Sequence, residues 1–502
     1  MQYLIGVDIG TQGTKTYLYD VDGNIVTDSF EASNLITRNG ITLQEPDEIF
    51  SSVINTIKET VDKSGVDNGD ICGIAMDSQM AGIMAIDENF NAVTYYDSWL
   101  DNGCKDYIEL IKNTCNDTFV KLTGAPVTNT IGPKIVWWKN ERNEEYKKIK
   151  KFVLPGIYVA GKMAGLKADE AVMDYTNIHF SGFADNKNME WSETLLNTFD
   201  IEHSKMPRIA SPFEVLGHVT METANLTRLK QGMPIVTGCG DTAANCFGAG
   251  IVNAGQAFDV AGTASVFACC VEEFKPNVDN DVLFNMRSVI EGNFTPLAYI
   301  GGGGMCIKWC MENLTGAEGS TYEKMEQAAS MIKAGSEGLT FIPHFEGRVC
   351  PSDQNMKGSF TGLGFNHNVS HMYRAIMEGI SYEYMFYNET MKNLGYEDSM
   401  NGIFGVGGGA KSRLFNQIKA DVLGVPYTPL KVKDSATLGC AVIAGVGVGL
   451  YSDAKGTISK MNAKEESVIP NFKNKEVYKN AYNTYIVTMG GLSNIYKKLS
   501  GR

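Results

Sequence analysis

The strongest constraint on the fold is a strand, glycine-threonine turn, strand pattern that occurs twice in the chain. Residues 3–9 and 14–20 are rich in β-forming side chains and flank the turn Gly10-Thr11-Gln12-Gly13. Residues 257–268 repeat this pattern around Gly262-Thr263. We interpret the recurrence as a diverged internal duplication, which predicts a molecule built from two related halves.

The length of the chain supports the same division. Single hydrophobic cores stop growing near ~250 to 300 residues, so 502 residues predict two large domains with a cleft between them. We place these domains at residues 1–250 and 251–490. Strands alternate with segments of helical periodicity, which predicts an α/β fold. The clearest predicted helices cover residues 47–63, 134–150, 192–200, 368–393 and 411–424, and a buried strand is predicted at 71–76.

Charge and cysteine content limit the partners and the compartment. A formal net charge of −14 argues against nucleic acid or an anionic membrane as the partner and favours a small molecule. We find no basic leader and no run of about 18 apolar residues, so we expect a cytoplasmic protein without a membrane anchor. Eleven cysteines without a CxxC pair fit a reducing compartment. Cys306 and Cys310 could bind a metal, but we expect buried thiols.

The first turn has the chemistry of a phosphate-binding loop. Asp8 ends the first strand, and the glycines at positions 10 and 13 let backbone N–H groups approach an anion closely. The hydroxyls of Thr11 and Thr14 can reach phosphate oxygens, and Asp8 is placed to hold magnesium through water. The alternative is an ordinary hairpin turn, because the short DxGTxGT string is not decisive alone.

A second acid, Asp241, follows a strand of small residues and precedes a predicted helix. A kinase needs a carboxylate that accepts the proton of the attacking hydroxyl, which contributes about 10² to 10⁴ in rate. Asp241 fits this role. The alternative is that Asp241 is the N-cap of the helix.

Three further glycine-rich segments complete the pattern. Gly262-Thr263 forms a second phosphate loop, and Gly301-Gly302-Gly303-Gly304 forms a tight turn into a helix. Gly405 to Ser412 reads as a strand followed by a glycine turn, against which a flat purine can lie. A P-loop or a dinucleotide site is disfavoured there, because neither a GK[ST] ending nor GxGxxG spacing is present. The order of these elements predicts an ATP-dependent phosphoryl transfer.

Taken in order, these motifs resemble the FGGY carbohydrate kinase family, and within it the xylulokinase-like branch, along nearly the whole chain. The resemblance rests on DIGTQGTK (8–15), GCGDTAANCFGAG (238–250), VAGTASV (260–266), FIPHFEGRVCPSD (341–353), GSFTGL (358–363), VGGGAKSRLFNQIKADVLGVP (406–426) and ATLGCAVIAG (436–445).

The resemblance implies an actin-like fold of two ribonuclease-H-like domains, with the sugar beside the first domain and ATP mainly on the second. It implies ATP and Mg²⁺ as cofactors, Asp241 as the base and Asp8 as the metal ligand. It is also compatible with a homodimer. The residues that it places around ATP are Thr11, Gln12, Gly13, Thr14, Lys15, Gly262, Thr263, Gly304, Gly408, Gly409, Ala410 and Ser412.

The predicted sugar pocket departs from the xylulokinase pattern at Ala81, Leu100 and Thr242, where histidine, asparagine and asparagine are usual. The resemblance implies a ketopentose such as xylulose, and because all three departures lie on the sugar side, a related ketose or polyol is an open alternative. For Met80 and Trp99 the alternative is core packing. The residues predicted to contact the sugar are Gln79, Met80, Ala81, Trp99, Asp101, Asp241 and Thr242.

Two other classes of function fit the sequence less well. One is an actin-like ATPase that acts on a protein partner. The segment from Gly238 to Asn245 and the pocket segment SQMAG (78–82) argue against it. The other is a ligand-binding regulator without catalysis, and the presence of both Asp8 and Asp241 argues against that.

Overall fold

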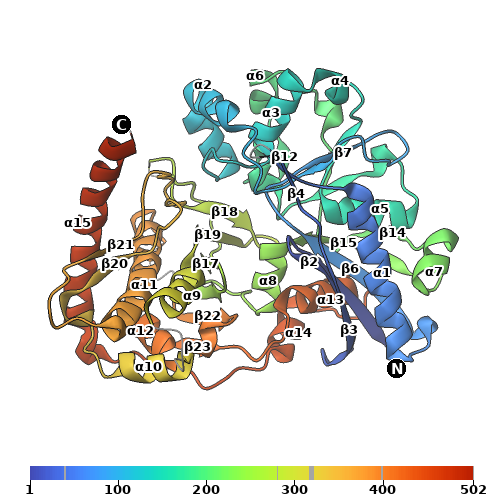
Figure 1. The fold of residues 1–502 in the computed structure, drawn as a ribbon. Coiled ribbons are helices and arrows are strands. Elements are labelled where there is room, and N and C mark those ends of the chain that lie inside the picture. Colours follow the sequence, from blue (N-terminus) through green and yellow to red (C-terminus); the bar gives the residue numbers. More distant parts are fainter. Residues whose placement is uncertain (39–40, 280, 316–320, 397–399, 501–502) are drawn as a thin grey trace.

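The computed structural model describes residues 1–500 except 39–40, 280, 316–320 and 397–399. Its frame is a pair of six-stranded mixed sheets, one in each half of the chain (Figure 1). The first sheet has the order β14-β15-β6-β1-β2-β3: Val215–His218, Pro234–Gly240, Ile71–Ser78, Tyr3–Ile9, Gly13–Asp20 and Ile25–Ala32. The second has the order β18-β19-β17-β16-β22-β23: Phe284–Arg287, Phe294–Ile300, Ser265–Cys269, Gln256–Ala261, Gly402–Val406 and Tyr427–Pro429.

The two sheets share a topology, which supports the predicted duplication. In each half an antiparallel hairpin, β1–β2 or β16–β17, carries a glycine-threonine turn. A parallel strand, β6 or β22, borders the first strand of each hairpin. The neighbours beyond these strands also correspond, β15 with β23 and β3 with β19. Strand β14 is added at one edge of the first sheet, and β18 at the opposite edge of the second.

Helices cover the sheets and form the ends of the molecule (Figure 1). They are α1 (Pro46–Ser64), α2 (Lys105–Thr123), α3 (Ile131–Glu141), α4 (Asn143–Tyr146), α5 (Pro155–Ala164), α6 (Glu193–Thr198), α7 (Met221–Thr227), α8 (Asp241–Gly248), α9 (Gly303–Leu314), α10 (Tyr322–Ser330), α11 (Val369–Asn393), α12 (Arg413–Leu423), α13 (Ser435–Gly447), α14 (Ala454–Met461) and α15 (Lys475–Ser500). Short strands are β4 (Ile36–Arg38), β5 (Ile41–Gln44), β7 (Met84–Ile86), β8 (Tyr96–Asp97), β9 (Lys151–Val153), β10 (Val172–Asp174), β11 (Ala184–Asp185), β12 (Glu190–Trp191), β13 (Arg208–Ala210), β20 (Thr340–Ile342) and β21 (Ser359–Thr361).

The residues predicted to start a helix near Pro46 lie at the start of α1, and a glycine ends the helix. Pro46 opens the helix, acids occupy its first turn, and Gly65 ends it with a φ of 65°. Its apolar stripe, which includes Val53 and Ile57, is buried, and the helix packs on β2 and β3.

The predicted helix over residues 134–150 is instead two helices, α3 and α4. The break lies at Arg142, whose φ and ψ are −119° and 45°. The Cζ atom of Arg142 lies over the Trp137 ring, 4.2 Å from its centroid. One guanidinium nitrogen of Arg142 lies 3.4 Å from Oδ1 of the buried Asp97. These tertiary contacts hold Arg142 outside helical geometry.

Helices α8 and α13 follow β15 and β23, and they pack against each other at the centre of the molecule (Figure 1). Glycines permit the close packing of α13 on both β1 and α8. A Cβ atom on Gly6 would lie 1.9 Å from the carbonyl oxygen of Thr437, and one on Gly248 would lie 1.7 Å from that of Ser435. Helix α13 therefore belongs to the second half in sequence but packs on the first sheet. The division at residue 250, which falls in the loop between α8 and β16, stays a prediction.

The expectation that two of the thiols are buried is confirmed. Cys306 and Cys310 are both buried in α9. Within the described part of the chain, no helix is both long enough and apolar enough to cross a membrane.

Candidate active site

Three acids meet at one edge of the first sheet. Strands β1, β6 and β15 are parallel neighbours, and Asp8 and Asp77 are directly paired in the register of β1 and β6. Asp241 follows the end of β15. The carboxyl ends of parallel strands are a common place for ligands in α/β sheets. Asp77 was not among the predicted site residues, although an acid at the end of a buried strand is the same signal that pointed to Asp8.

Lys15 connects the first loop to α13. Its Nζ lies 3.1 Å from Asp8 Oδ2 and 3.0 Å from Asp434 Oδ2. Asp434 is also the N-cap of α13, where it accepts the backbone N–H of Thr437. Lys15 was predicted to contact ATP, and the structure places it among carboxylates at the base of the loop. Asp434 was missed, because it lies 419 residues from Lys15 in the sequence.

Asp241 is the first residue of α8, and Gly240 is the N-cap. The alternative interpretation of Asp241 as the N-cap is therefore wrong. Its Oδ1 accepts hydrogen bonds from the backbone N–H of Thr242 at 2.5 Å and from the Thr242 hydroxyl at 3.1 Å. Burial, with the negative charge of Asp8 as a second cause, raises the pKa of Asp241 to about 7. This is the pKa range in which a general base works best near neutral pH.

A pH dependence follows if Asp241 accepts the proton of the sugar. The base acts only when ionised, and its pKa is raised to about 7, so kcat/KM is expected to fall as the pH decreases through that value. The profile of kcat/KM between pH 5 and 9 measures this. A kcat/KM that stays level down to pH 5, as expected for a base with the ordinary aspartate pKa of 3.8, would contradict the assignment.

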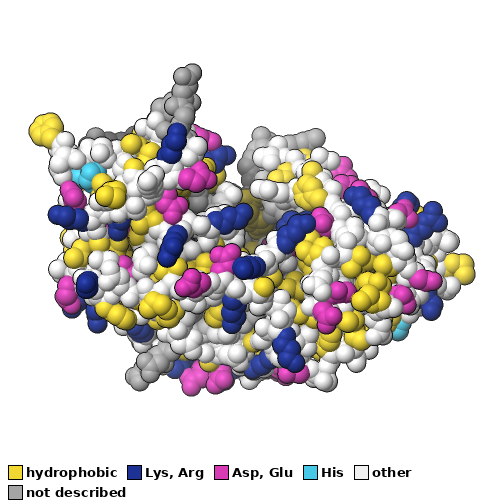
Figure 2. Space-filling model, turned by 90° about the horizontal axis from the view of Figure 1, so that it is seen from below, with side chains coloured by type: hydrophobic (Ala, Val, Ile, Leu, Met, Phe, Trp, Pro, Cys, Tyr) yellow, Lys and Arg dark blue, Asp and Glu magenta, His cyan; other side chains and the backbone are white. Residues whose placement is uncertain are grey.

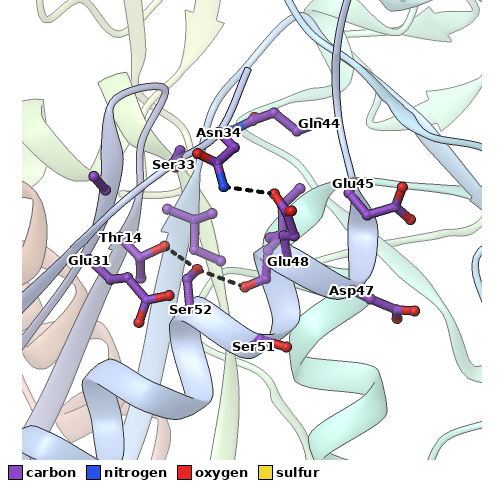
Figure 3. A pocket seen from close by; sticks show the side chains of 13 residues that line it. Thr14, Glu31, Ser33, Asn34, Gln44, Glu45, Asp47, Glu48, Ser51 and Ser52 are labelled. Carbon is purple, nitrogen blue, oxygen red and sulfur yellow. Dashed lines mark hydrogen bonds between the residues drawn. The ribbon is translucent and has the colours of Figure 1, made fainter. Parts of the chain in front are cut away.

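The first loop divides its side chains between two faces of the sheet. Because side chains alternate along a strand, Lys15 faces α13 and Thr14 faces α1. Figure 3 shows the Thr14 hydroxyl directed at Ser52 on α1, at 2.8 Å, in a polar recess behind the loop. In this arrangement the Thr14 hydroxyl does not face the acids. Gln12 is exposed at the tip, and Gly13 packs so closely on Phe30 that a Cβ would lie 2.3 Å from its ring.

The predicted sugar side is tied to this loop by side chains. The indole N–H of Trp99 donates to the Thr11 hydroxyl at 2.9 Å, and that hydroxyl donates to Gln79 Oε1 at 3.1 Å. Asp101 is fully buried, and its Oδ2 has no hydrogen-bond partner. The buried Lys134 ammonium instead donates to the Asp101 main-chain carbonyl at 3.1 Å. The structure thus brings Gln79, Trp99 and Thr11 together.

The SQMAG segment supports the turn that carries Asp241. A Cβ on Gly240 would lie 2.5 Å from the Met80 sulfur, so Met80 packs directly on this turn. Ala81 has a φ of 63°, a left-handed conformation that is uncommon for a residue with a side chain. Leu100, the second departure, is exposed, and Thr242, the third, holds the Asp241 carboxylate. Met80 therefore has a packing role beside any contact with sugar.

The glycine-rich segments of the second half line one pocket of about 620 Å³. Figure 2 shows the surface hollowed between the two halves of the molecule. Six of the residues predicted to contact ATP line this pocket: Gly262, Thr263, Gly304, Gly408, Gly409 and Ser412. Ala410 is buried beside it, and its carbonyl accepts the side-chain amide of Asn416.

The second phosphate loop is held against α9. Backbone N–H groups of Gly304 and Met305 donate to the carbonyls of Gly262 and Thr263. A Cβ on Gly304 would lie 2.1 Å from the Gly262 oxygen, so only glycine permits this contact. The pocket walls also include residues that were missed: Lys308, Tyr322, Glu326, Tyr373, Met377 and Phe415. They come from helices whose sequence shows only amphipathic spacing, so no local signal marks them.

The acids at the sheet edge suit a divalent cation. Asp8, Asp77 and Asp241 affect one another's ionisation, and Oδ1 of Asp77 is buried without a hydrogen-bond partner. Burial raises the pKa of Asp77 well above its ordinary value, and the negative charge of Asp8 adds to this. Carboxylate oxygens and water are the ligands that Mg²⁺ prefers. Among the described residues, no group of three or more His, Cys, Asp or Glu side chains is arranged to hold a metal ion by itself. Asp8 as a ligand of Mg²⁺ therefore stays a prediction, in which water and phosphate oxygens complete the coordination.

Sequence comparison then decides the family. A profile of the FGGY family of carbohydrate kinases, N-terminal domain, matches residues 3–248, and the profile of its C-terminal domain matches residues 260–448. The chain belongs to the FGGY family of carbohydrate kinases. It is therefore an ATP-dependent phosphotransferase that acts on a sugar hydroxyl.

Relatives of this FGGY kinase carry different substrate names. It is 26% identical to a xylulose kinase of Staphylococcus epidermidis over 491 residues, which is 96% of each chain. It is 27% identical to a gluconokinase of Bacillus subtilis, covering 93% of this chain and 90% of that one. The solved structure of a ligand-bound xylulose kinase from Lactobacillus acidophilus matches 99% of this chain and 100% of its own, with a TM-score of 0.92 and 26% identity. The predicted α/β fold of two related domains is confirmed.

Proposed function

We propose that this kinase transfers the γ-phosphate of ATP to a hydroxyl of a neutral ketose or polyol, with a ketopentose such as xylulose as the first candidate. One observation carries the proposal: Asp241, with its raised pKa, lies at the sheet edge where Asp8 also ends its strand. The alternative of an ATPase that acts on a protein partner loses its basis with the family assignment.

In this mechanism the first sheet binds the sugar and the second binds the nucleotide. Asp241 accepts the proton of the attacking hydroxyl as its oxygen bonds to the γ-phosphorus, while the bond from the γ-phosphorus to the β,γ-bridging oxygen breaks and ADP leaves with that electron pair. Asp8 would hold Mg²⁺, which neutralises charge on the phosphates when bound. Gly262 and Gly408 would lie against the nucleotide, and Trp99 and Asp101 would orient the sugar and exclude water.

The charge of the site favours a neutral sugar over an aldonate. Asp8, Asp101 and Asp241 are acidic, and a substrate carboxylate beside them would be repelled. The two lysines near them are already engaged, Lys15 with carboxylates and Lys134 with the Asp101 carbonyl and, at 2.6 Å, with Asn129. This supports a xylulose-like rather than a gluconate-like substrate. A cytoplasmic location remains an expectation drawn from the sequence, and a homodimer remains an expectation drawn from the family resemblance.

The test is ADP release from Mg-ATP with a panel of ketopentoses, ketohexoses, ketoheptoses, alditols and gluconate. We expect a neutral ketose or polyol to stimulate release well above the sugar-free rate. If gluconate alone stimulated ADP release, the proposal of a neutral substrate would be wrong. If no sugar raised ADP release above a steady basal rate of ATP hydrolysis, the proposal of a sugar substrate would be wrong.

Replacing Asp8 by alanine should impair metal use and turnover together. The variant loses the carboxylate that would hold Mg²⁺ and leaves Lys15 paired with Asp434 alone. We expect a higher Mg²⁺ concentration for half-maximal activity and a lower kcat, measured by magnesium titration at saturating ATP and sugar. An unchanged Mg²⁺ requirement would contradict the metal role of Asp8.

A further inference from the structure

Strand β15, which ends directly before Asp241, is paired with β14 along only part of its length. Strand β14 pairs with β15 only as far as Val236, and the register of β15 against β6 shifts between Val236 and Cys239. Beyond that point the N–H groups of Thr237 and Gly238 donate to carbonyls of a loop, those of Glu214 and Pro212. The next group on this edge is the N–H of Gly240, directly before Asp241. An unpaired buried N–H would be costly there.

A side chain takes the place of the missing strand. The Gly240 N–H donates to the hydroxyl oxygen of Thr176 at 3.0 Å. Thr176 is fully buried, and its own proton goes to Oδ1 of Asp174, which also accepts the Thr176 backbone N–H at 3.0 Å. The direction of both bonds is therefore fixed. The hydroxyl proton is committed to Asp174, so its lone pairs are left for Gly240.

The supporting segment is itself held firmly. Oδ2 of Asp174 accepts the side-chain amide of Asn177 at 2.8 Å, so both carboxylate oxygens have partners. The Tyr175 N–H donates to the carbonyl of Ala210, and the Tyr175 hydroxyl donates to the carbonyl of Val289 at 2.6 Å. Residue 289 follows β18 of the second sheet. The segment 174–177 thus links the turn before Asp241 to both halves of the molecule.

We propose that Thr176, held by Asp174, is a positioning residue for Asp241. Neither residue touches the substrate in this mechanism. Their hydrogen-bonded chain fixes the Gly240 peptide and, through it, the direction in which the Asp241 carboxylate leaves the sheet. The inference rests on the proposed role of Asp241 as the base.

The test compares Thr176→Val with Thr176→Ser. Valine keeps the shape but leaves the Gly240 N–H without an acceptor, whereas serine keeps the hydroxyl. Because displacements of about 1 Å at a reacting group can cost on the order of 100-fold in rate, we expect Thr176→Val to lower kcat by about 10- to 100-fold with KM for ATP unchanged. Thr176→Ser should retain most of the turnover. The acid limb of the pH profile should move to lower pH in Thr176→Val, because a loosened Asp241 gains water.

Thr227→Val is the matched control. Thr227 is also fully buried, and its hydroxyl donates to the Thr223 carbonyl at 2.7 Å and accepts the Leu229 N–H at 3.2 Å, in α7 away from the acids. We expect it to lose similar thermal stability with kcat and the acid limb unchanged. Titration of the Asp241 carboxyl by ¹³C NMR reports the same displacement without turnover.

The outcomes separate the two claims. If the wild-type protein is inactive with every sugar, the proposed function is wrong. In that case a lower titration midpoint of the Asp241 carboxyl in Thr176→Val, measured by ¹³C NMR, still supports the positioning role. A wild-type kcat and an unchanged Asp241 midpoint in folded Thr176→Val would overturn the positioning role.

Discussion

Asp241→Asn is expected to lower kcat by about 10² to 10⁴ and, at the same time, to raise the thermal stability of the protein. The first effect follows from losing the group that accepts the sugar proton, since an amide cannot do so. Binding of ATP should be nearly unchanged, because the nucleotide pocket is lined by residues of the second half. Steady-state kinetics measures kcat, and calorimetric titration with ATP measures the affinity for the nucleotide.

The size of the stability gain depends on pH. The pKa of Asp241 is about 7 in the folded protein and near 3.8 in an unfolded chain, so the unfolded state ionises first as the pH rises. The folded state therefore loses relative stability between these values and stays penalised above pH 7. Asparagine removes the penalty, which is at most a few kcal/mol because each pKa unit corresponds to about 1.4 kcal/mol. The gain in melting temperature should be largest at pH 8 and vanish near pH 4.

Asp87→Asn is the matched control for this prediction. Backbone and side-chain hydrogen bonds from Asn91 and Asn89 outweigh burial and lower the pKa of Asp87. The same substitution should therefore lower stability slightly at neutral pH and leave kcat unchanged. Full turnover of Asp241→Asn would remove Asp241 from the role of base, and an Asp241→Asn protein less stable than wild type at pH 8 would contradict the penalty.

Local sequence was sufficient for features whose causes are local. The strand at residues 3–9, the helix that opens at Pro46 and the two glycine-threonine turns were all predictable from propensity, capping and turn chemistry. The acids Asp8 and Asp241 could be singled out because each ends a strand of small or apolar residues.

The missed parts depend on contacts between distant segments. Lys15 meets Asp434, Trp99 meets Thr11 and Thr176 meets Gly240, and no spacing within the sequence encodes these pairs. Thr14 is a different case. Strand alternation would have placed its hydroxyl on the face opposite Lys15, so its orientation toward α1 was within reach of sequence reasoning.

Lys419→Met is expected to destabilise the second half of the molecule by about 3 to 5 kcal/mol, the usual cost of leaving a buried charge without its partner. Lys419 and Asp259 are both fully buried and form an ion pair. The hydroxyls of Tyr384 and Tyr427 each donate to Asp259 at 2.7 Å. Urea unfolding followed by far-UV circular dichroism measures the loss. Lys497→Met on the exposed end of α15 is the control and should change little.

The internal duplication suggests a double variant that completes this test. Asp259 lies three residues before Gly262, just as Val7 lies three residues before Gly10 in the first hairpin. One half therefore builds this position from a buried ion pair and the other from valine. Apolar replacement of a whole buried pair is often neutral or stabilising, so Asp259→Val/Lys419→Met should recover part of what Lys419→Met loses. Recovery should be incomplete, because Tyr384 and Tyr427 lose their acceptor. A double variant less stable than Lys419→Met alone would mean that the ion pair is not the source of the loss.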